Sequence, residues 1–242
     1  MTAAAMVFVG DLGLPSLTTG DAHHLVDVLR LRPGETVVAS DGAGRWVPCR
    51  VGPGTARGRR ARDLDPAGVL VVDGPVTSTI APRPAVMVGF APSKGDRPEW
   101  VIQKLTELGV DRIIPIRSAR SVVRWEGERG DRAVARLRRV AREAAAQCRR
   151  PWLPEVSTAT ALDALAARTG VPTCLAHPGG RVPSLDPPLL AVGPEGGWDP
   201  DELARHGPGV GLGPHVLRAE TAALAAGAVL CALRSGMVGS LA

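Results

Sequence analysis

Residues 189–202 read Leu189-Leu190-Ala191-Val192-Gly193-Pro194-Glu195-Gly196-Gly197-Trp198-Asp199-Pro200-Asp201-Glu202. The four apolar residues at the start predict a short buried strand, and the glycines after them predict a loop. Asp199 is suited to cap a helix that has Pro200 at its first position and Glu202 at its third. Open α/β sheets bind ligands at such a loop between a strand and a helix. A simple turn is the alternative, but Glu195 inside the loop favours a site for a cationic or polar ligand.

The same alternation of strand and helix continues on both sides of this loop. We expect strands at 85–90, 112–116, 173–176, 189–192 and 210–212. We expect helices at 97–108, 132–149, 158–168, 200–206 and 221–234. Because the two element types alternate, the fold class is predicted to be α/β, with a parallel sheet that helices cover on both faces.

The first part of the chain has a different pattern, with short apolar runs separated by glycine and proline. Strands are expected at 6–9, 36–40, 46–51 and 69–72, and a hairpin turn at Asp41-Gly42. One helix is expected at 21–30, with Asp21 as its N-cap. Short strands at regular spacing suggest a small barrel. We therefore predict a β-barrel domain over residues 1–73, a linker over 74–84 and an α/β domain over 85–242.

The composition is that of a globular protein, with 45% hydrophobic and 22% charged residues among 242. No apolar run is long enough to cross a membrane. The four cysteines have no metal-binding spacing with one another or with the five histidines, so we expect reduced, mostly buried thiols, no metal and a cytoplasmic protein. Residues 74–155 carry sixteen basic and nine acidic side chains, which suggests a polyanionic partner.

Two further patterns bear on what the chain binds. The helix at 132–149 carries an apolar stripe and, on another face, arginines that either are simply solvated or track phosphates. The stripe consists of Val134, Leu137, Ala141, Ala144 and Cys148. The glycines at 209–213 suggest a dinucleotide-binding fingerprint, but Pro214 stands where a helix would open. A nucleotide-dependent oxidoreductase is therefore disfavoured, whereas a non-catalytic RNA-binding module remains an alternative.

Several segments, in this order and spacing, resemble the bacterial small-subunit (16S) rRNA uridine-N3 methyltransferase family of the SPOUT superfamily. They are His24–Gly34, Lys94–Asp96, Gln103–Val110, Glu143–Arg150, Leu175–Pro178, Gly193–Gly197 and Leu212–Thr221. Each segment alone is weak evidence, but the ordered set covers nearly the whole chain and is specific.

The resemblance implies a PUA-like N-terminal β-barrel and a C-terminal SPOUT domain with a deep trefoil knot. It also implies a homodimer with its active site at the subunit interface, and S-adenosyl-L-methionine as the cofactor. Carried over by motif, the cofactor contacts are Leu175, His177, Gly193, Glu195, Gly196, Gly197, Leu212, Gly213, Val216, Leu217 and Arg218.

The chemistry that the resemblance implies is methylation of N3 of a uridine in ribosomal RNA; methylation of another RNA is the alternative. We expect Arg218 to face the negative charge that develops on the base, and Glu195 or Glu220 to accept the proton. Glu220 has a second interpretation, as an acid that stabilises the first turn of a helix. The side chains expected to bind RNA are Arg30, Arg32, Lys94, Arg97, Arg117, Arg120, Arg142 and Arg150.

Overall fold

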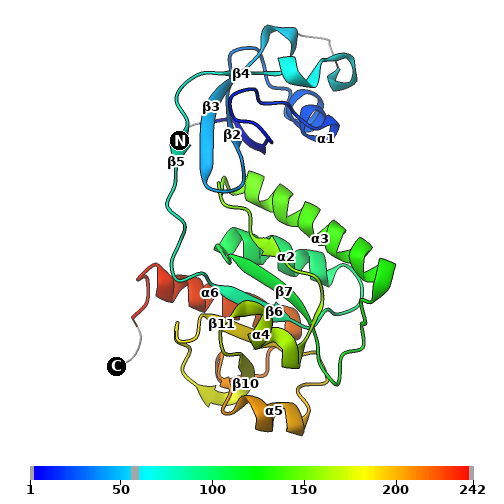
Figure 1. Cartoon of the computed structure of the whole chain (residues 1–242), viewed down its shortest axis with the longest axis vertical. Coiled ribbons are helices and arrows are strands. Elements are labelled where there is room, and N and C mark those ends of the chain that lie inside the picture. The colour runs from blue at the N-terminus through cyan, green and yellow to red at the C-terminus, as the bar shows by residue number, and fades with distance from the viewer. Residues whose placement is uncertain (1–2, 56–59, 240–242) are drawn as a thin grey trace. The chain divides into compact units, whose positions relative to one another are not determined.

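A computed structural model describes residues 3–55 and 60–239 of the chain (Figure 1). The outer ends of the two predicted domains, residues 1–2 and 240–242, lie outside the described residues. The chain divides into two compact units, Met1–Ala81 with Ala145–Leu153 and Pro82–Ala144 with Pro154–Ala242. The first unit therefore combines the N-terminal third of the chain with a short segment from its middle.

The first unit is built on a five-stranded sheet with the order β1-β2-β3-β4, in which β5 also pairs with β3. Its strands are β1 (Ala5–Phe8), β2 (Thr36–Ser40), β3 (Arg45–Val51), β4 (Leu70–Val72) and β5 (Thr77–Ser78). β1 and β2 are parallel and the other pairs are antiparallel. The predicted hairpin between β2 and β3 is confirmed: the Asp41 carboxylate accepts hydrogen bonds from the backbone N–H groups of Ala43 and Arg45. β5 lies within the stretch predicted as a linker.

The helix of the first unit begins earlier than predicted. α1 (Thr19–His23) continues into a π-helical turn, η1 (His24–Val28). Thr18 is extended and its hydroxyl accepts a hydrogen bond from the Asp21 N–H, at 3.1 Å. Asp21 as the N-cap was therefore wrong, because the hydroxyl three residues earlier satisfies the free N–H of the first turn. Short 3-10 turns follow at η2 (Pro53–Thr55), η3 (Ala61–Asp63) and η4 (Pro66–Gly68).

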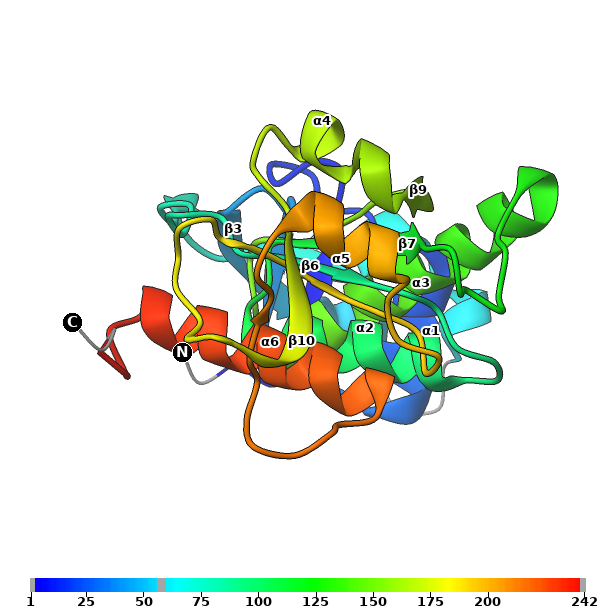
Figure 2. The same ribbon diagram turned by 90° about the horizontal axis from the view of Figure 1, so that it is seen from below.

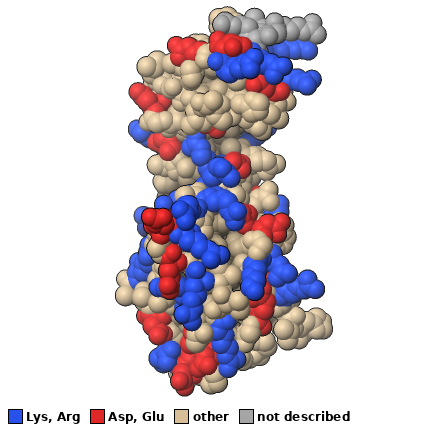
Figure 3. Space-filling model, turned by 90° about the vertical axis from the view of Figure 1, so that its right-hand side faces the viewer, with Lys and Arg blue, Asp and Glu red and all other residues tan. Residues whose placement is uncertain are grey.

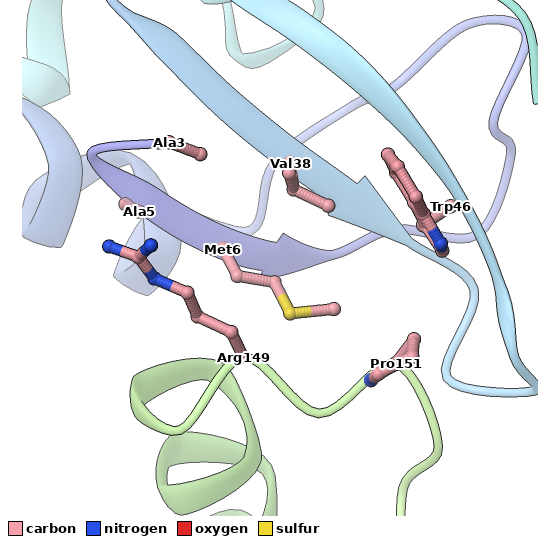
Figure 4. A pocket seen from close by; sticks show the side chains of 7 residues that line it. All are labelled: Ala3, Ala5, Met6, Val38, Trp46, Arg149 and Pro151. Atoms are coloured by element: carbon pink, nitrogen blue, oxygen red, sulfur yellow. The ribbon is translucent and has the colours of Figure 1, made fainter. Parts of the chain in front are cut away.

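A segment from the middle of the chain completes the first unit. The Gly44 N–H donates to the Pro151 carbonyl, and the Leu153 N–H donates to the Gly42 carbonyl. A Cβ on Gly44, whose φ is +89°, would lie 2.3 Å from the Trp152 ring, so only glycine allows this approach. Figure 4 shows Met6 and Val38 on the side of the sheet that faces this segment. The space left between them is only about 10 Å³, so the segment is part of the core of this unit.

The second unit contains a six-stranded sheet in which every strand pair is parallel, as predicted. Its order is β10-β11-β6-β7-β8, and β9 pairs with β7. The strands are β6 (Met87–Phe90), β7 (Arg112–Arg117), β8 (Glu155–Val156), β9 (Thr160–Ala161), β10 (Cys174–Arg181) and β11 (Leu189–Val192). The helices are α2 (Arg97–Leu108), α3 (Gly127–Gln147), α4 (Leu165–Thr169), α5 (Pro200–His206) and α6 (Ala219–Arg234).

Helices cover both faces of this sheet, as Figure 2 shows. Val88 of β6 faces the core formed with α2, α3 and α6, whereas its neighbour Met87 faces α4 and α5. This alternation follows from the two-residue period of a strand. β6 and β11 are buried on both faces, so each is a continuous apolar run.

Three predictions for the second unit were wrong. The helix expected at 158–168 is replaced by β9, the 3-10 turn η5 (Leu162–Ala164) and α4, because residues 160 and 161 pair with the end of β7. No strand forms at 210–212; Val210 makes only single bridges to Ala176 and Arg181. The helix expected at 132–149 spans Gly127–Gln147 instead, so Cys148, the last residue of its apolar stripe, lies beyond the helix and is exposed.

The thiols are less buried than expected. Cys49 alone is buried; Cys174 and Cys231 are half-buried, and all four cysteines are unbridged. Burial raises the pKa of Cys49 to about 11. Among the described residues, no helix is long and apolar enough to cross a membrane.

Candidate functional site

Three segments of the second unit line one cavity of about 490 Å³. They are the middle of β10 at 176–178, the loop after β11 at 192–198, and residues 212–222 leading into α6. β10 pairs with β11 at Cys174 and Leu175, so residues 176–178 of β10 lie beside the loop that follows β11, at the carboxyl edge where α/β sheets bind ligands. The volume falls in the range of pockets for small molecules and cofactors.

The glycine loop is held by its neighbours on both sides. A Cβ on Gly193 would lie 3.0 Å from the Trp198 ring, and Gly197 has a φ of +71°, so larger residues would displace the loop. The buried Trp198 donates its indole N–H to the Ala176 carbonyl at 2.8 Å, which joins the loop to β10. The capping box predicted for the following helix is confirmed, with Asp199 and Glu202 as its two members.

An arginine lies between the two candidate acids. The Arg97 guanidinium is 3.4 Å from a Glu195 carboxylate oxygen and 3.9 Å from one of Glu220. The Glu220 side chain is 15% exposed, and its Oε2 is buried with no hydrogen-bond partner in the described chain. A buried carboxylate oxygen without a partner is costly, so this atom can accept a proton or a hydrogen bond from a ligand.

Arg218 has a different environment. It is exposed, occupies the N-cap position of α6 and lines the cavity. Within the part of the chain that the structure describes, no carboxylate forms an ion pair with its guanidinium. Its positive charge therefore remains available to an anionic ligand group.

Most of the predicted cofactor residues line the cavity. They are His177, Gly193, Glu195, Gly197, Leu212, Gly213, Val216, Leu217 and Arg218. Leu175 is fully buried in the core behind the cavity, and Gly196 turns its carbonyl toward Arg120, at 3.2 Å. Glu220 does not line the cavity but follows Ala219, which does.

Sequence reasoning missed several residues that line the cavity. Trp198 and His215 both line the cavity, although no role was predicted for either of them from the sequence. Because both residues lie next to glycines of the two loops, their positions in the sequence could have identified them as cavity residues. Leu203 of α5 also lines the cavity, and nothing in its helical pattern pointed to it.

The predicted RNA-binding side chains are divided between the two units. Arg30, Arg32 and Arg150 belong to the first unit, and the other five to the second. In the second unit, two of them lie at the glycine loop. Arg97 forms an ion pair with Glu195, and Arg120 is 3.7 Å from Asp199. The others are Arg117, which pairs with Glu126, half-buried Arg142 and exposed Lys94. No group of three or more His, Cys, Asp or Glu side chains that could hold a metal occurs in the described ranges.

Comparison with known families matches both parts of the chain. Residues 81–231 match the model of the RNA methyltransferase domain, and residues 17–57 match the RNA methyltransferase PUA domain. The first match spans most of the second unit and contains all three segments that line the cavity.

Individual proteins agree with these matches. The ribosomal RNA small subunit methyltransferase E of Mycobacterium bovis is 37% identical over 238 residues, covering 90% of this chain and 87% of that protein. The protein of the same name from Bacillus subtilis is 29% identical, with 86% of each chain covered.

Solved structures give the same result. The small subunit methyltransferase E of Neisseria gonorrhoeae, bound to S-adenosyl methionine, has a TM-score of 0.76 and 27% identity, covering 95% of this chain and 97% of that one. A Legionella pneumophila methyltransferase structure with bound cofactor SAM has a TM-score of 0.79 and 27% identity, covering 96% and 98%. With its glycine-loop cavity, its PUA domain and these relatives, the chain belongs to the ribosomal RNA small subunit methyltransferase E family.

Proposed function

We propose that this chain transfers the methyl group of S-adenosyl-L-methionine to N3 of a specific uridine in small-subunit (16S) ribosomal RNA. The observation that carries the proposal is the gathering of three loops around one cavity in a chain of this family. The cofactor is inferred from two similar structures, which hold S-adenosyl methionine.

The residues around the cavity suit this cofactor. The backbone of the loop at 193–197 offers N–H and C=O groups to a polar ligand, while Leu212, Val216 and Leu217 supply apolar surface. Glu195 offers a carboxylate to a cationic group, at the mouth of the cavity. When bound, the cofactor supplies an electrophilic methyl group.

The chain's own residues prepare the uridine. N3 carries a weakly acidic proton, so it becomes a good nucleophile only when that proton leaves. Arg218 stabilises the negative charge on the base, and Glu220 or Glu195 accepts the proton. Arg97, which contacts both carboxylates, keeps them in place. Holding the base against the methyl donor contributes the remaining rate enhancement.

The target base has to leave its stack to enter this cavity. The predicted arginines and Lys94 bind the phosphates of the surrounding RNA, including Arg30 and Arg32 of the first unit. The first unit, Met1–Ala81 with Ala145–Leu153, serves as the RNA-binding PUA-like β-barrel, which the sequence places at residues 1–73.

Finer structural expectations of the family belong to the same proposal. We expect a homodimer that works in the cytoplasm, with each active site at the subunit interface. A trefoil knot is supported by the close crossing of 174–181 with 209–211, where a Cβ on Gly180 would lie 2.4 Å from Gly209. The Arg181 N–H also donates to the Gly209 carbonyl, and the Gly211 N–H to the Arg181 carbonyl.

Identification of the methylated atom tests the proposal. Small-subunit rRNA from a strain lacking this protein is incubated, naked or in assembled subunits, with methyl-labelled S-adenosylmethionine and the chain. Mass spectrometry of the nucleosides is expected to show 3-methyluridine at one position. Methyl label on another atom, or on another RNA only, would contradict the N3 assignment. Cofactor binding without any transfer would favour the non-catalytic RNA-binding module.

A further inference from the structure

The second unit has another cavity, of about 780 Å³, that shares no lining residue with the cofactor cavity. Three segments line it: the loop at 93–95 before α2, residues 122–125, and the first turns of α3 from Arg129 to Arg136. All three belong to the same compact unit.

Five cationic side chains line this cavity, and none of its lining residues is acidic. Arg136 forms an ion pair with Glu99, and Arg132 lies 3.4 Å from the highly exposed Glu128. The other three cations, Lys94, Arg124 and Arg129, pair with no carboxylate in the described parts of the chain. Like charges that converge without counter-charges attract an anion.

Several other arginines of the same unit pair with acids. Arg112 lies 2.9 Å from Glu155, and Arg117 lies 2.7 Å from Glu126. Figure 3 shows one face of this unit, where acidic side chains lie among the basic ones. The cavity therefore gathers three cations that have no matching acid among the described residues.

Backbone and aromatic groups add to the charge. α2 and α3 both begin next to the lining residues, and Asp96 at the start of α2 makes no side-chain cap hydrogen bond. Helix N-termini carry partial positive charge and free N–H groups that favour phosphates. The half-buried Trp125 also lines the cavity and packs on the core beneath it. An aromatic ring among cations suits an RNA strand, in which bases stack and phosphates pair.

The position of the cavity connects it to methyl transfer. Lys94 lines it, whereas Arg97, three residues later, contacts Glu195 of the cofactor cavity. Three residues span at most about 11 Å, so a strand held at one cavity reaches the other within a few nucleotides. We infer that the cavity around Arg124, Arg129 and Trp125 binds the phosphate backbone of unpaired RNA next to the target base. The inference rests on the proposed function.

The test removes two of the unpaired charges, in the variant Arg124→Gln/Arg129→Gln. A matched control, Arg168→Gln/Arg205→Gln, removes two charges from α4 and α5 on the opposite face of the sheet. Binding of transcribed 16S rRNA is measured over a series of salt concentrations. We expect the first variant to bind at least about tenfold more weakly, with a salt slope reduced by about 1.4 to 1.8, and the control to bind as wild type.

Two further measurements separate binding from folding and chemistry. S-adenosylmethionine affinity by calorimetry is expected to stay at the wild-type value, and Arg124→Lys/Arg129→Lys is expected to recover most RNA affinity. Wild-type RNA affinity and slope in the Gln variant, or equal losses in the control, would overturn the inference. RNA binding is measured without methyl transfer, so an error in the N3 assignment would leave this result unchanged.

Discussion

At the scale of single residues, two acids that pair with Arg97 compete for one role: Glu195, which lines the cavity, and Glu220, which follows the lining residue Ala219. Glu195 is half-exposed in the glycine loop, whereas Glu220 is mostly buried at the start of α6 and has one oxygen without a hydrogen bond. The missing partner favours Glu220 as the proton acceptor, while its position also suits the dipole of α6. Among the described residues, Arg97 is the side chain that pairs with both acids, and each acid can be replaced separately.

Single-turnover methyl transfer at saturating RNA and cofactor distinguishes these roles. Arg218→Ala is expected to lower the rate by about 10² to 10³, because it removes the charge that stabilises the uridine anion. Glu220→Gln is expected to lower it by about 10² to 10⁴ if Glu220 accepts the proton. A loss in Glu195→Gln instead would transfer the role to that residue. Wild-type rates in Arg218→Ala and Glu220→Gln would remove both from the mechanism.

At the scale of elements, the α6 helix depends on small residues where it packs against α2. A Cβ added at Gly227 would lie 2.6 Å from Leu105 of α2 and 3.1 Å from Val110. Alanine is the better helix former by about 1 kcal/mol, so helix propensity alone predicts that Gly227→Ala stabilises the protein. The close approach predicts the opposite, because neither neighbour has room to move in the buried core.

We expect Gly227→Ala to lower the free energy of unfolding by about 1 to 3 kcal/mol, as overpacked cores do. Urea denaturation followed by circular dichroism measures this change. Gly10→Ala serves as the control, since a Cβ there meets nothing within 4 Å, and its effect is expected to stay within about 1 kcal/mol. Increased stability of Gly227→Ala would mean that α2 and α6 pack loosely.

At the scale of the whole molecule, each unit contains a carboxylate whose pKa is lowered by the fold, so we expect acidic pH to destabilise both units. Burial works to raise the pKa of Glu155, but the Ser157 hydroxyl and Arg112 outweigh it and lower that pKa below its usual value. In the first unit, burial likewise works to raise the pKa of Asp41. The Arg45 side chain and the backbone N–H groups of Ala43 and Arg45 outweigh it, so the pKa of Asp41 is also lowered. A carboxylate whose pKa is lowered in the folded state stabilises the fold at pH values above its unfolded-state pKa. This stabilisation is lost as the pH falls through the folded-state pKa.

The stability of the wild type is therefore expected to fall as the pH drops below about 4.3, the usual glutamate value. Glu155→Gln is expected to remove part of this dependence, by a few tenths of a kcal/mol, because the side chain is 55% exposed and solvent screens the pair. Urea titrations between neutral and acidic pH measure it, with Glu128→Gln as the highly exposed control. An unchanged pH profile in Glu155→Gln would show that the ion pair across β7 and β8 does not contribute.

Local patterns predicted much of this fold. α2, α5 and β11 begin and end where the sequence places them, because cap residues, a glycine and apolar runs act over a few residues. For the helix predicted at 158–168, a distant partner overrode the local preference: β7 pairs with residues 160 and 161, and only the short helix α4 forms after them.

The sequence by itself determined the glycine loop and its capping box, since these depend on residues close together in the chain, and the alternation of strands and helices predicted the parallel sheet. Only the tertiary structure brought Arg97 between Glu195 and Glu220, and the segment 145–153 into the first unit. It also gathered Lys94, Arg124 and Arg129 around one cavity. These contacts depend on strand order and helix packing, which no local periodicity encodes, because the contacting residues lie tens of positions apart.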